Sequence, residues 1–157
     1  MSLDFQVVVF ELDERRYGLR LSAVDRILRA VDVTPLLEAP EVVWGIIDVQ
    51  GQIVPVLSLR ERFGLPERPI GVSDQFVLAR TRQRTVALVV DGVRGVFERA
   101  VAEVIGSDKI LPDLKQIEGV IRLDDGMVLI HDLDRFLSLD EERAVAQAIS
   151  NRENDEP

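Results

Sequence analysis

Residues 45–63, GIIDVQGQIVPVLSLRERF, return in altered form as residues 119–136, GVIRLDDGMVLIHDLDRF. Gly45 and Gly119, which begin the two copies, lie 74 residues apart. Each copy has the pattern of a strand, a turn rich in glycine or aspartate, a second strand and one helical turn. The repeat therefore predicts a duplicated structural unit.

A further hairpin of apolar strands precedes each copy. Phe5, Leu19 and Val24 in the first half match Phe76, Leu88 and Val93 in the second at separations of 71, 69 and 69 residues. Alternating apolar residues and turn signals predict strands at Phe5–Leu12, Tyr17–Leu21, Trp44–Val49, Gln52–Leu57, Phe76–Ala79, Thr85–Val90, Val93–Phe97, Ile117–Leu123 and Met127–Ile130.

One short helix is predicted in the first half. Ser22 is a suitable N-cap, and Val24, Ile27 and Leu28 then share one helical face at the i, i+3, i+4 spacing. This helix ends near Ala30. A second helix begins near residue 140, and its apolar stripe predicts packing on a barrel; the stripe consists of Ala144, Val145, Ala148 and Ile149.

These elements predict an all-β protein with short helices. Each half offers about five short strands, and so small a sheet removes its open edges best by closing into a barrel, with an open sandwich as the alternative. Pro55 cannot donate to a strand ladder, so its strand is expected at an edge or with a bulge. The expected divisions are a first barrel unit at 5–63, a connector at 64–74, a second barrel unit at 75–137, and a C-terminal helix with an acidic tail at 138–157.

Composition narrows the functional classes. The 157 residues are 46% hydrophobic and carry a net charge of −9, which suits a globular protein and opposes binding to nucleic acid or anionic membranes. No cysteine is present, which excludes disulfides and thiol chemistry and fits a reducing cytoplasm. The apolar runs are far shorter than the roughly 20 residues of a membrane span.

No constellation of residues indicates catalysis, a metal site or a cofactor. His131 is the single histidine and is interpreted as a surface group at a strand end rather than a base. The adjacent acids Asp124 and Asp125 fit a turn, and Glu141 and Glu142 fit a helix start. Activity of the phosphotransfer, hydrolase or redox type is not expected.

Several segments taken together resemble the CheW chemotaxis adaptors. They are YGLRL at 17–21 with VDRI at 24–27, GIIDVQGQIVPV at 45–56 with Leu59-Arg60, and VVDGV at 89–93. The resemblance covers about Phe5 to Leu137. It implies two SH3-like five-stranded barrels side by side, no enzymatic activity and no cofactor. It also implies a cytoplasmic adaptor, recruited to membrane receptor arrays, that bridges the regulatory domain of a histidine kinase and the signalling tips of chemoreceptors.

The resemblance assigns a receptor-binding surface in the groove between the barrels, consisting of Val24, Arg26, Gly45, Asp48, Gln50 and Gly51. Members of the family usually have glutamate where this chain has Arg26, asparagine at Asp48 and arginine at Gln50. An ion pair of Arg26 with Asp48 is expected to replace the usual one. A purely structural role for Val24 and the glycines remains open.

Two other functions remain open. The altered polar residues are also compatible with a regulator that competes for the kinase or the receptor without completing the bridge. A small-molecule sensor is a third and more distant possibility.

Overall fold

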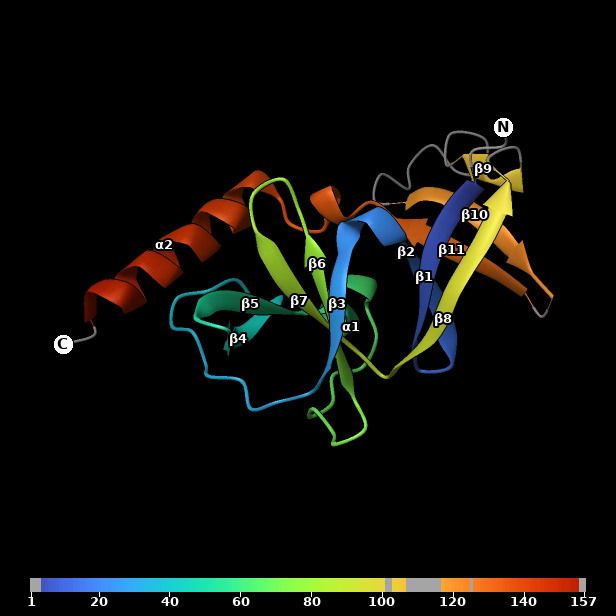
Figure 1. The fold of residues 1–157 in the computed structure, drawn as a ribbon. Coiled ribbons are helices and arrows are strands. Elements are labelled where there is room, and N and C mark those ends of the chain that lie inside the picture. Colours follow the sequence, from blue (N-terminus) through green and yellow to red (C-terminus); the bar gives the residue numbers. More distant parts are fainter. Residues whose placement is uncertain (1–3, 101–102, 107–116, 125, 156–157) are drawn as a thin grey trace.

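The chain folds into two β-sheets and a C-terminal helix (Figure 1). This computed structural model describes residues 4–100, 103–106, 117–124 and 126–155. The first sheet has the strand order β8 (Gly92–Ala100), β1 (Asp4–Leu12), β2 (Arg15–Arg20), β11 (Gly126–His131), β10 (Ile117–Leu123) and β9 (Ile105–Gly106). The second has the order β3 (Val24–Arg29), β6 (Gln75–Arg80), β7 (Thr85–Val90), β5 (Gln52–Ser58) and β4 (Val43–Val49). The helical segments are η1 (Leu21–Ala23), α1 (Leu59–Phe63), η4 (Leu133–Arg135) and α2 (Leu139–Asp155).

Each sheet takes strands from both halves of the sequence. The hairpin of β1 and β2 joins β8, β10 and β11, while the hairpin of β6 and β7 joins β3, β4 and β5. Each of these hairpins pairs in parallel with a strand from the other half of the sequence. Gly18 of β2 lies opposite Ile130 of β11, and Ala87 of β7 lies opposite Val56 of β5. The connector at 64–74 therefore divides the sequence repeats but not the two sheets, because each repeat contributes its first hairpin to the other sheet.

Both sheets close in the same way. In the second, a segment that follows β3 crosses to β4, where Thr34 and Ile46 exchange backbone hydrogen bonds of 2.9 and 2.8 Å. In the first, β9 follows β8 and places Ile105 opposite Val120 of β10. The first and last strands of each sheet are thus joined through the chain, which confirms the two barrels rather than an open sandwich.

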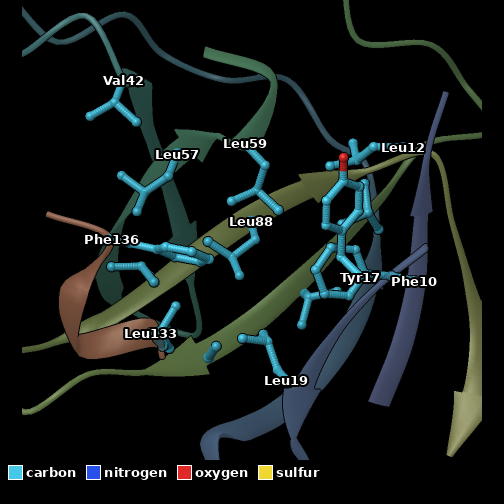
Figure 2. Packing of buried hydrophobic residues seen from close by; sticks show 14 of the residues in the cluster. Phe10, Leu12, Tyr17, Leu19, Val42, Leu57, Leu59, Leu88, Leu133 and Phe136 are labelled. Carbon is cyan, nitrogen blue, oxygen red and sulfur yellow. The ribbon is translucent and has the colours of Figure 1, made fainter. Parts of the chain in front are cut away.

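Three hydrophobic cores fill this arrangement. One core lies inside the first barrel, which the first sheet forms, and includes Val9 and Ile121. Another lies inside the second barrel, which the second sheet forms, and includes Phe76 and Leu78. The largest lies between the barrels and receives side chains from both sheets, as Figure 2 shows; it includes Phe10, Leu12, Tyr17, Leu19, Leu57, Leu59, Leu88, Leu133 and Phe136. Strands such as β7 are buried on both faces, which explains their unbroken apolar sequences.

The helix predicted from Ser22 to Ala30 is wrong, because this segment contains η1 and strand β3. Val24 lies opposite Ala79 of β6 and Arg26 lies opposite Leu78, so Asp25 is the extra residue of a β-bulge. The bulge interrupts the two-residue alternation and leaves apolar residues at a spacing that imitates a helix.

The edge position expected for the strand of Pro55 is also wrong, because β5 lies between β4 and β7. Both backbone hydrogen bonds of Ile46 go to Thr34, so Ile46 and Pro55 face each other without a mutual hydrogen bond. The pairing with β7 begins only at Val56. The absence of an N–H group at Pro55 therefore removes no hydrogen bond between the strands. The β-bulge of the β4–β5 pair lies in β4, at Trp44, and not in the strand of Pro55.

The C-terminal helix packs against the core between the barrels, as its apolar stripe predicts. Val145 and Ala148 of α2 are buried, with 0% and 3% of their surface exposed. Ion pairs hold its first turn: Arg62 of α1 lies 2.6 Å from Glu141, and Arg84 lies 2.7 Å from Glu142. None of the helices in the described ranges is both long and apolar enough to cross a membrane.

His131 is buried rather than at the surface, with 5% of its area exposed. Its ring packs among those of Phe63, Tyr17 and Phe136, at centroid distances of 4.6, 5.5 and 5.7 Å. Neither ring nitrogen has a hydrogen-bond partner among the described residues. Burial disfavours the charged imidazolium and lowers the pKa of His131 to about 4.

Glycine is required where the closing segment of the second sheet crosses β4, whereas the matching place in the first sheet is less crowded. A Cβ atom on Gly45 would lie 2.2 Å from the carbonyl oxygen of Thr34, whereas one on Gly119 would lie 3.0 Å from that of Ile105. We expect Gly45→Ala to lower the free energy of unfolding by about 3 kcal/mol, because the overlap is with backbone. The same change at Gly119 is the matched control and should cost clearly less in urea unfolding. Equal losses at both positions would contradict this account of closure.

The burial of His131 predicts a stability that depends on pH. In the unfolded chain His131 has a pKa near 6.5, so between about pH 6.5 and 4 it binds a proton that the folded protein does not bind. The contribution of neutral His131 to the free energy of unfolding is therefore full above about pH 6.5 and decreases as the pH falls toward 4. The loss approaches about 3 kcal/mol at pH 4. His131→Phe should remove this component, measured as the difference between the two proteins in urea unfolding from pH 7.5 to 4. Parallel pH profiles would show that His131 is not responsible.

Candidate functional site

Four of the six expected receptor-binding residues gather on one surface of the second barrel. Arg26 is on β3, and Asp48, Gln50 and Gly51 are at the β4–β5 turn. A side-chain hydrogen bond joins Arg26 to Gln50, and a second hydrogen bond joins Asp48 to Gly51 within the turn. Arg26, Asp48, Gln50 and Gly51 are all exposed. We call these four residues the polar patch.

The other two expected residues have a different position. Gly45 is buried at the crossing of Thr34 and Ile46, so it supports the barrel and offers no surface to a partner. Val24 is half-buried and packs against the core between the barrels. Neither residue belongs to the polar patch.

The β4–β5 turn fixes the shape of the polar patch. Gln50 and Gly51 have φ angles of 52° and 88°, the pair of positive values typical of a type I′ hairpin turn. Asp48 holds the turn, because its carboxylate accepts a 2.7 Å hydrogen bond from the backbone N–H of Gly51. Gln50 is therefore held in a conformation that few side chains other than asparagine adopt.

Arg26 contacts Gln50 and not Asp48. Its Nη2 donates a 3.3 Å hydrogen bond to Oε1 of Gln50, and its Nε lies 3.6 Å from the carboxylate of Asp25. In the described part of the chain, the expected ion pair with Asp48 is not formed, and the carboxylate of Asp48 caps the turn instead. Both contacts of Arg26 are exposed, so they contribute little to stability and leave the guanidinium accessible to a partner.

Apolar side chains are exposed on β3, just after β3 and in the connector. Ile27 and Val31 are 39% and 52% exposed, and Val72 in the connector is fully exposed. Residues 30–33 and 68–72 enclose a hollow of about 420 Å³ beside Trp44, which is half-buried against the core of the second barrel. Polar groups next to exposed apolar side chains are typical of a protein-binding surface.

An ionic network around the buried side chain of Arg60 was not predicted from the sequence. Arg60, 5% exposed, donates from Nη1 and Nη2 to Asp13 at 2.8 and 2.7 Å, and from Nη2 to Asp91 at 3.0 Å. Arg68 bridges Asp91 and Asp74 at 2.6 and 2.8 Å. The hydrogen bonds from Arg60 lower the pKa of Asp13. The network ties the β1–β2 turn of the first barrel to α1 and the connector.

Comparisons with known proteins agree with this architecture. The family model of the CheW-like domain matches residues 6–141. Chemotaxis protein CheW of Treponema pallidum is 26% identical over 148 residues, which cover 90% of this chain and 87% of that protein. Protein FrzA of Myxococcus xanthus is 27% identical over 144 residues, 88% of each chain. The crystal structure of scaffolding protein TtCheW from Thermoanaerobacter tengcongensis gives a TM-score of 0.79 at 28% identity, covering 90% of this chain and 96% of that one.

The positive φ of Gln50 predicts that glycine stabilises the turn. Gln50→Gly should raise the free energy of unfolding by about 1 kcal/mol, because glycine adopts this conformation without a steric penalty. Gln52→Gly, at the exposed start of β5, is the control and should lower it by about 0.5–1 kcal/mol. Urea unfolding of the three proteins measures both effects. A loss of stability in Gln50→Gly would mean that the side-chain contact with Arg26 outweighs the strain.

Proposed function

The chain belongs to the CheW-like domain family, and on that premise we propose that it is a non-catalytic adaptor coupling a chemotaxis-type histidine kinase to chemoreceptors. The main support is that the family match extends across both barrels, from residue 6 to residue 141. The structural relative that covers 90% of this chain is itself named a scaffolding protein. An adaptor needs separate surfaces for its partners, and two barrels that share a core support this requirement.

We assign the receptor contact to the polar patch and to Ile27, the exposed apolar residue that follows Arg26 in the chain. The positions of Arg26 and Gln50 carry glutamate and arginine in typical members of the family, and here these two positions are in hydrogen-bond contact at 3.3 Å. Contact between the two positions supports a coupled change, in which the acid and the base were replaced together. The exchange alters the charge presented to a receptor while keeping a hydrogen bond across the patch.

The kinase contact belongs, in this proposal, to a different part of the surface, and its partner is the regulatory domain of the kinase. The adaptor works in the cytoplasm and reaches the membrane through the receptors it binds. Its contribution is positional: binding two proteins at once raises the effective concentration of each at the other.

A second candidate function is that of a regulator that binds one partner without completing the bridge. The altered pair of Arg26 and Gln50 favours this alternative, since a patch that no longer fits a receptor would leave only the kinase contact. Pull-downs with the kinase and receptor fragments, offered separately and together, distinguish the two functions. The adaptor retains both fragments at once, whereas the competing regulator retains one and releases the other.

Substituting Arg26 and Gln50 in the polar patch should change which receptor the chain binds. Arg26→Glu with Gln50→Arg should strengthen binding to a receptor whose own adaptor carries the usual glutamate and arginine at these two positions. Affinity for the kinase regulatory domain should stay within about a factor of ten, or 1.4 kcal/mol. The proteins are titrated against each fragment by calorimetry.

A matched control uses the same charge changes just outside the polar patch. Arg29→Glu with Gln52→Arg alters exposed residues of β3 and β5 and should leave receptor binding unchanged. If the substitutions at 26 and 50 alter kinase binding more than receptor binding, the patch has been assigned to the wrong partner.

A further inference from the structure

The hollow of about 420 Å³ on the second barrel has an apolar floor and apolar rims. The segment that follows β3 forms one of its walls, and the connector forms the other. Val33, Trp44 and Ile70 line the hollow and pack against the core of the second barrel. Val31 on one wall is 52% exposed, and Val72 on the other is fully exposed. Both rims are thus open to solvent.

A buried carboxylate holds the two walls in place. Asp74, which is 3% exposed, accepts hydrogen bonds of 3.0 and 2.8 Å from Arg68 and one of 2.7 Å from the backbone N–H of Gly71. Its backbone carbonyl accepts a 3.1 Å hydrogen bond from the N–H of Ala30 on the opposite wall. Arg68, Gly71 and Ala30 all line the hollow. The hollow is therefore preformed, and a partner can bind it without the entropic cost of ordering these segments.

Comparison of the two repeats shows that closure of a barrel does not require Trp44. Trp44 is the extra residue of the β-bulge in β4, and Glu118, 74 residues later, is the extra residue of the bulge in β10. Glu118 forms an ion pair with Arg20. The bulge is thus common to both barrels, whereas the aromatic side chain occurs in only one. Tryptophan is enriched among the residues that contribute most to protein binding, which suits its place on the floor of an open hollow.

The unpaired charge at the hollow is negative. Its charged lining residues are Arg68 and Asp32. Arg68 is neutralised, because it lies 2.8 Å from Asp74 and 2.6 Å from Asp91. Asp32 is exposed and has no ion pair or side-chain hydrogen bond within the described part of the chain. An acidic rim beside an apolar floor favours a basic partner, and the net charge of −9 adds to this attraction.

We propose that this hollow binds an aliphatic side chain of a protein partner, with a neighbouring lysine or arginine of that partner paired to Asp32. The volume is sufficient for one large aliphatic side chain and its backbone. Covering Val31 and Val72 removes apolar surface from water and favours binding, while Asp32 selects the charge of the partner. None of the four polar-patch residues lines the hollow, so this inference does not rest on the proposed receptor contact.

Trp44 is the single tryptophan of the chain, so its fluorescence reports directly on the hollow. The probe is the pentapeptide acetyl-Lys-Ser-Leu-Ser-Lys-amide, titrated into the full chain at low salt. The emission of Trp44 should move to shorter wavelength with saturation, because the leucine excludes water from the indole ring. Replacing the leucine of the probe by glycine should weaken binding at least about threefold, and replacing both lysines by glutamate should do so at least about threefold.

Substitutions on the two walls separate the apolar contact from the charge. Val72→Ser should weaken binding of the probe at least about threefold and leave urea unfolding unchanged, because this side chain is fully exposed. Leu37→Ser, at another exposed apolar residue, is the matched control and should bind as the unaltered chain does. Asp32→Asn should abolish the preference for the lysine probe, whereas Glu41→Gln, at an exposed acid outside the hollow, should retain it.

Three results would overturn the proposal: no saturable change in the emission of Trp44, equal binding of the lysine and glutamate probes, or normal binding by Val72→Ser. A fourth is a change of this emission with protein concentration in the absence of the probe. A second copy of the chain would then occupy the hollow in place of a basic partner.

Discussion

The exchange of hairpins between the two sequence repeats is the constraint on which the rest of this structure depends. Strand β2 lies parallel to β11, and β7 lies parallel to β5, so each barrel is completed by the other half of the chain. The exchanged strands have two buried faces. In β6, Phe76 points into the second barrel while Val77 joins the core between the barrels. A barrel therefore cannot lose its exchanged hairpin without exposing both cores.

Ion pairs also join the two barrels. Arg60 holds Asp13 from the first barrel and Asp91 from the β7–β8 link, which is where the chain passes from one sheet to the other. Arg60 is a buried member of this network, and a buried charge that loses its partners costs free energy. Core packing and the ionic network together hold the barrels in one relative orientation. In the proposed adaptor function, this fixed orientation would hold the two partners at a fixed separation.

Local patterns in the sequence predict the strands and turns well, because turn residues such as Gln50-Gly51 act over a few residues. The error at Val24–Arg29 came from the bulge at Asp25, which adds one residue and hides the alternation of a strand. The exchange of hairpins has no local signature, because a hairpin has the same pattern whichever barrel it joins. The position of Pro55 was likewise decided by a partner strand remote in sequence.

Four of the six candidate residues lie together on the second barrel, but their contacts differ from the expected ones. The segments of Arg26 and Gln50 were expected to be neighbours, and their side chains do meet. The partner predicted for Asp48 was wrong, since its carboxylate accepts a hydrogen bond from Gly51, three residues later, and forms no ion pair with Arg26. The network of Arg60 was missed because Asp13 and Asp91 look like ordinary turn residues until the fold brings them together.

Native-state hydrogen exchange tests the central claim, that the exchanged hairpins make the two barrels one cooperative unit. Amides of Leu19 in β2 and Leu88 in β7 are each buried in the core between the barrels, and they report on opposite sheets. If neither barrel opens alone, both amides exchange through the same opening, with equal free energies that match global unfolding and fall together in denaturant. A clearly lower opening free energy for one of the two, unchanged by low denaturant, would show that one barrel opens independently and would contradict this account.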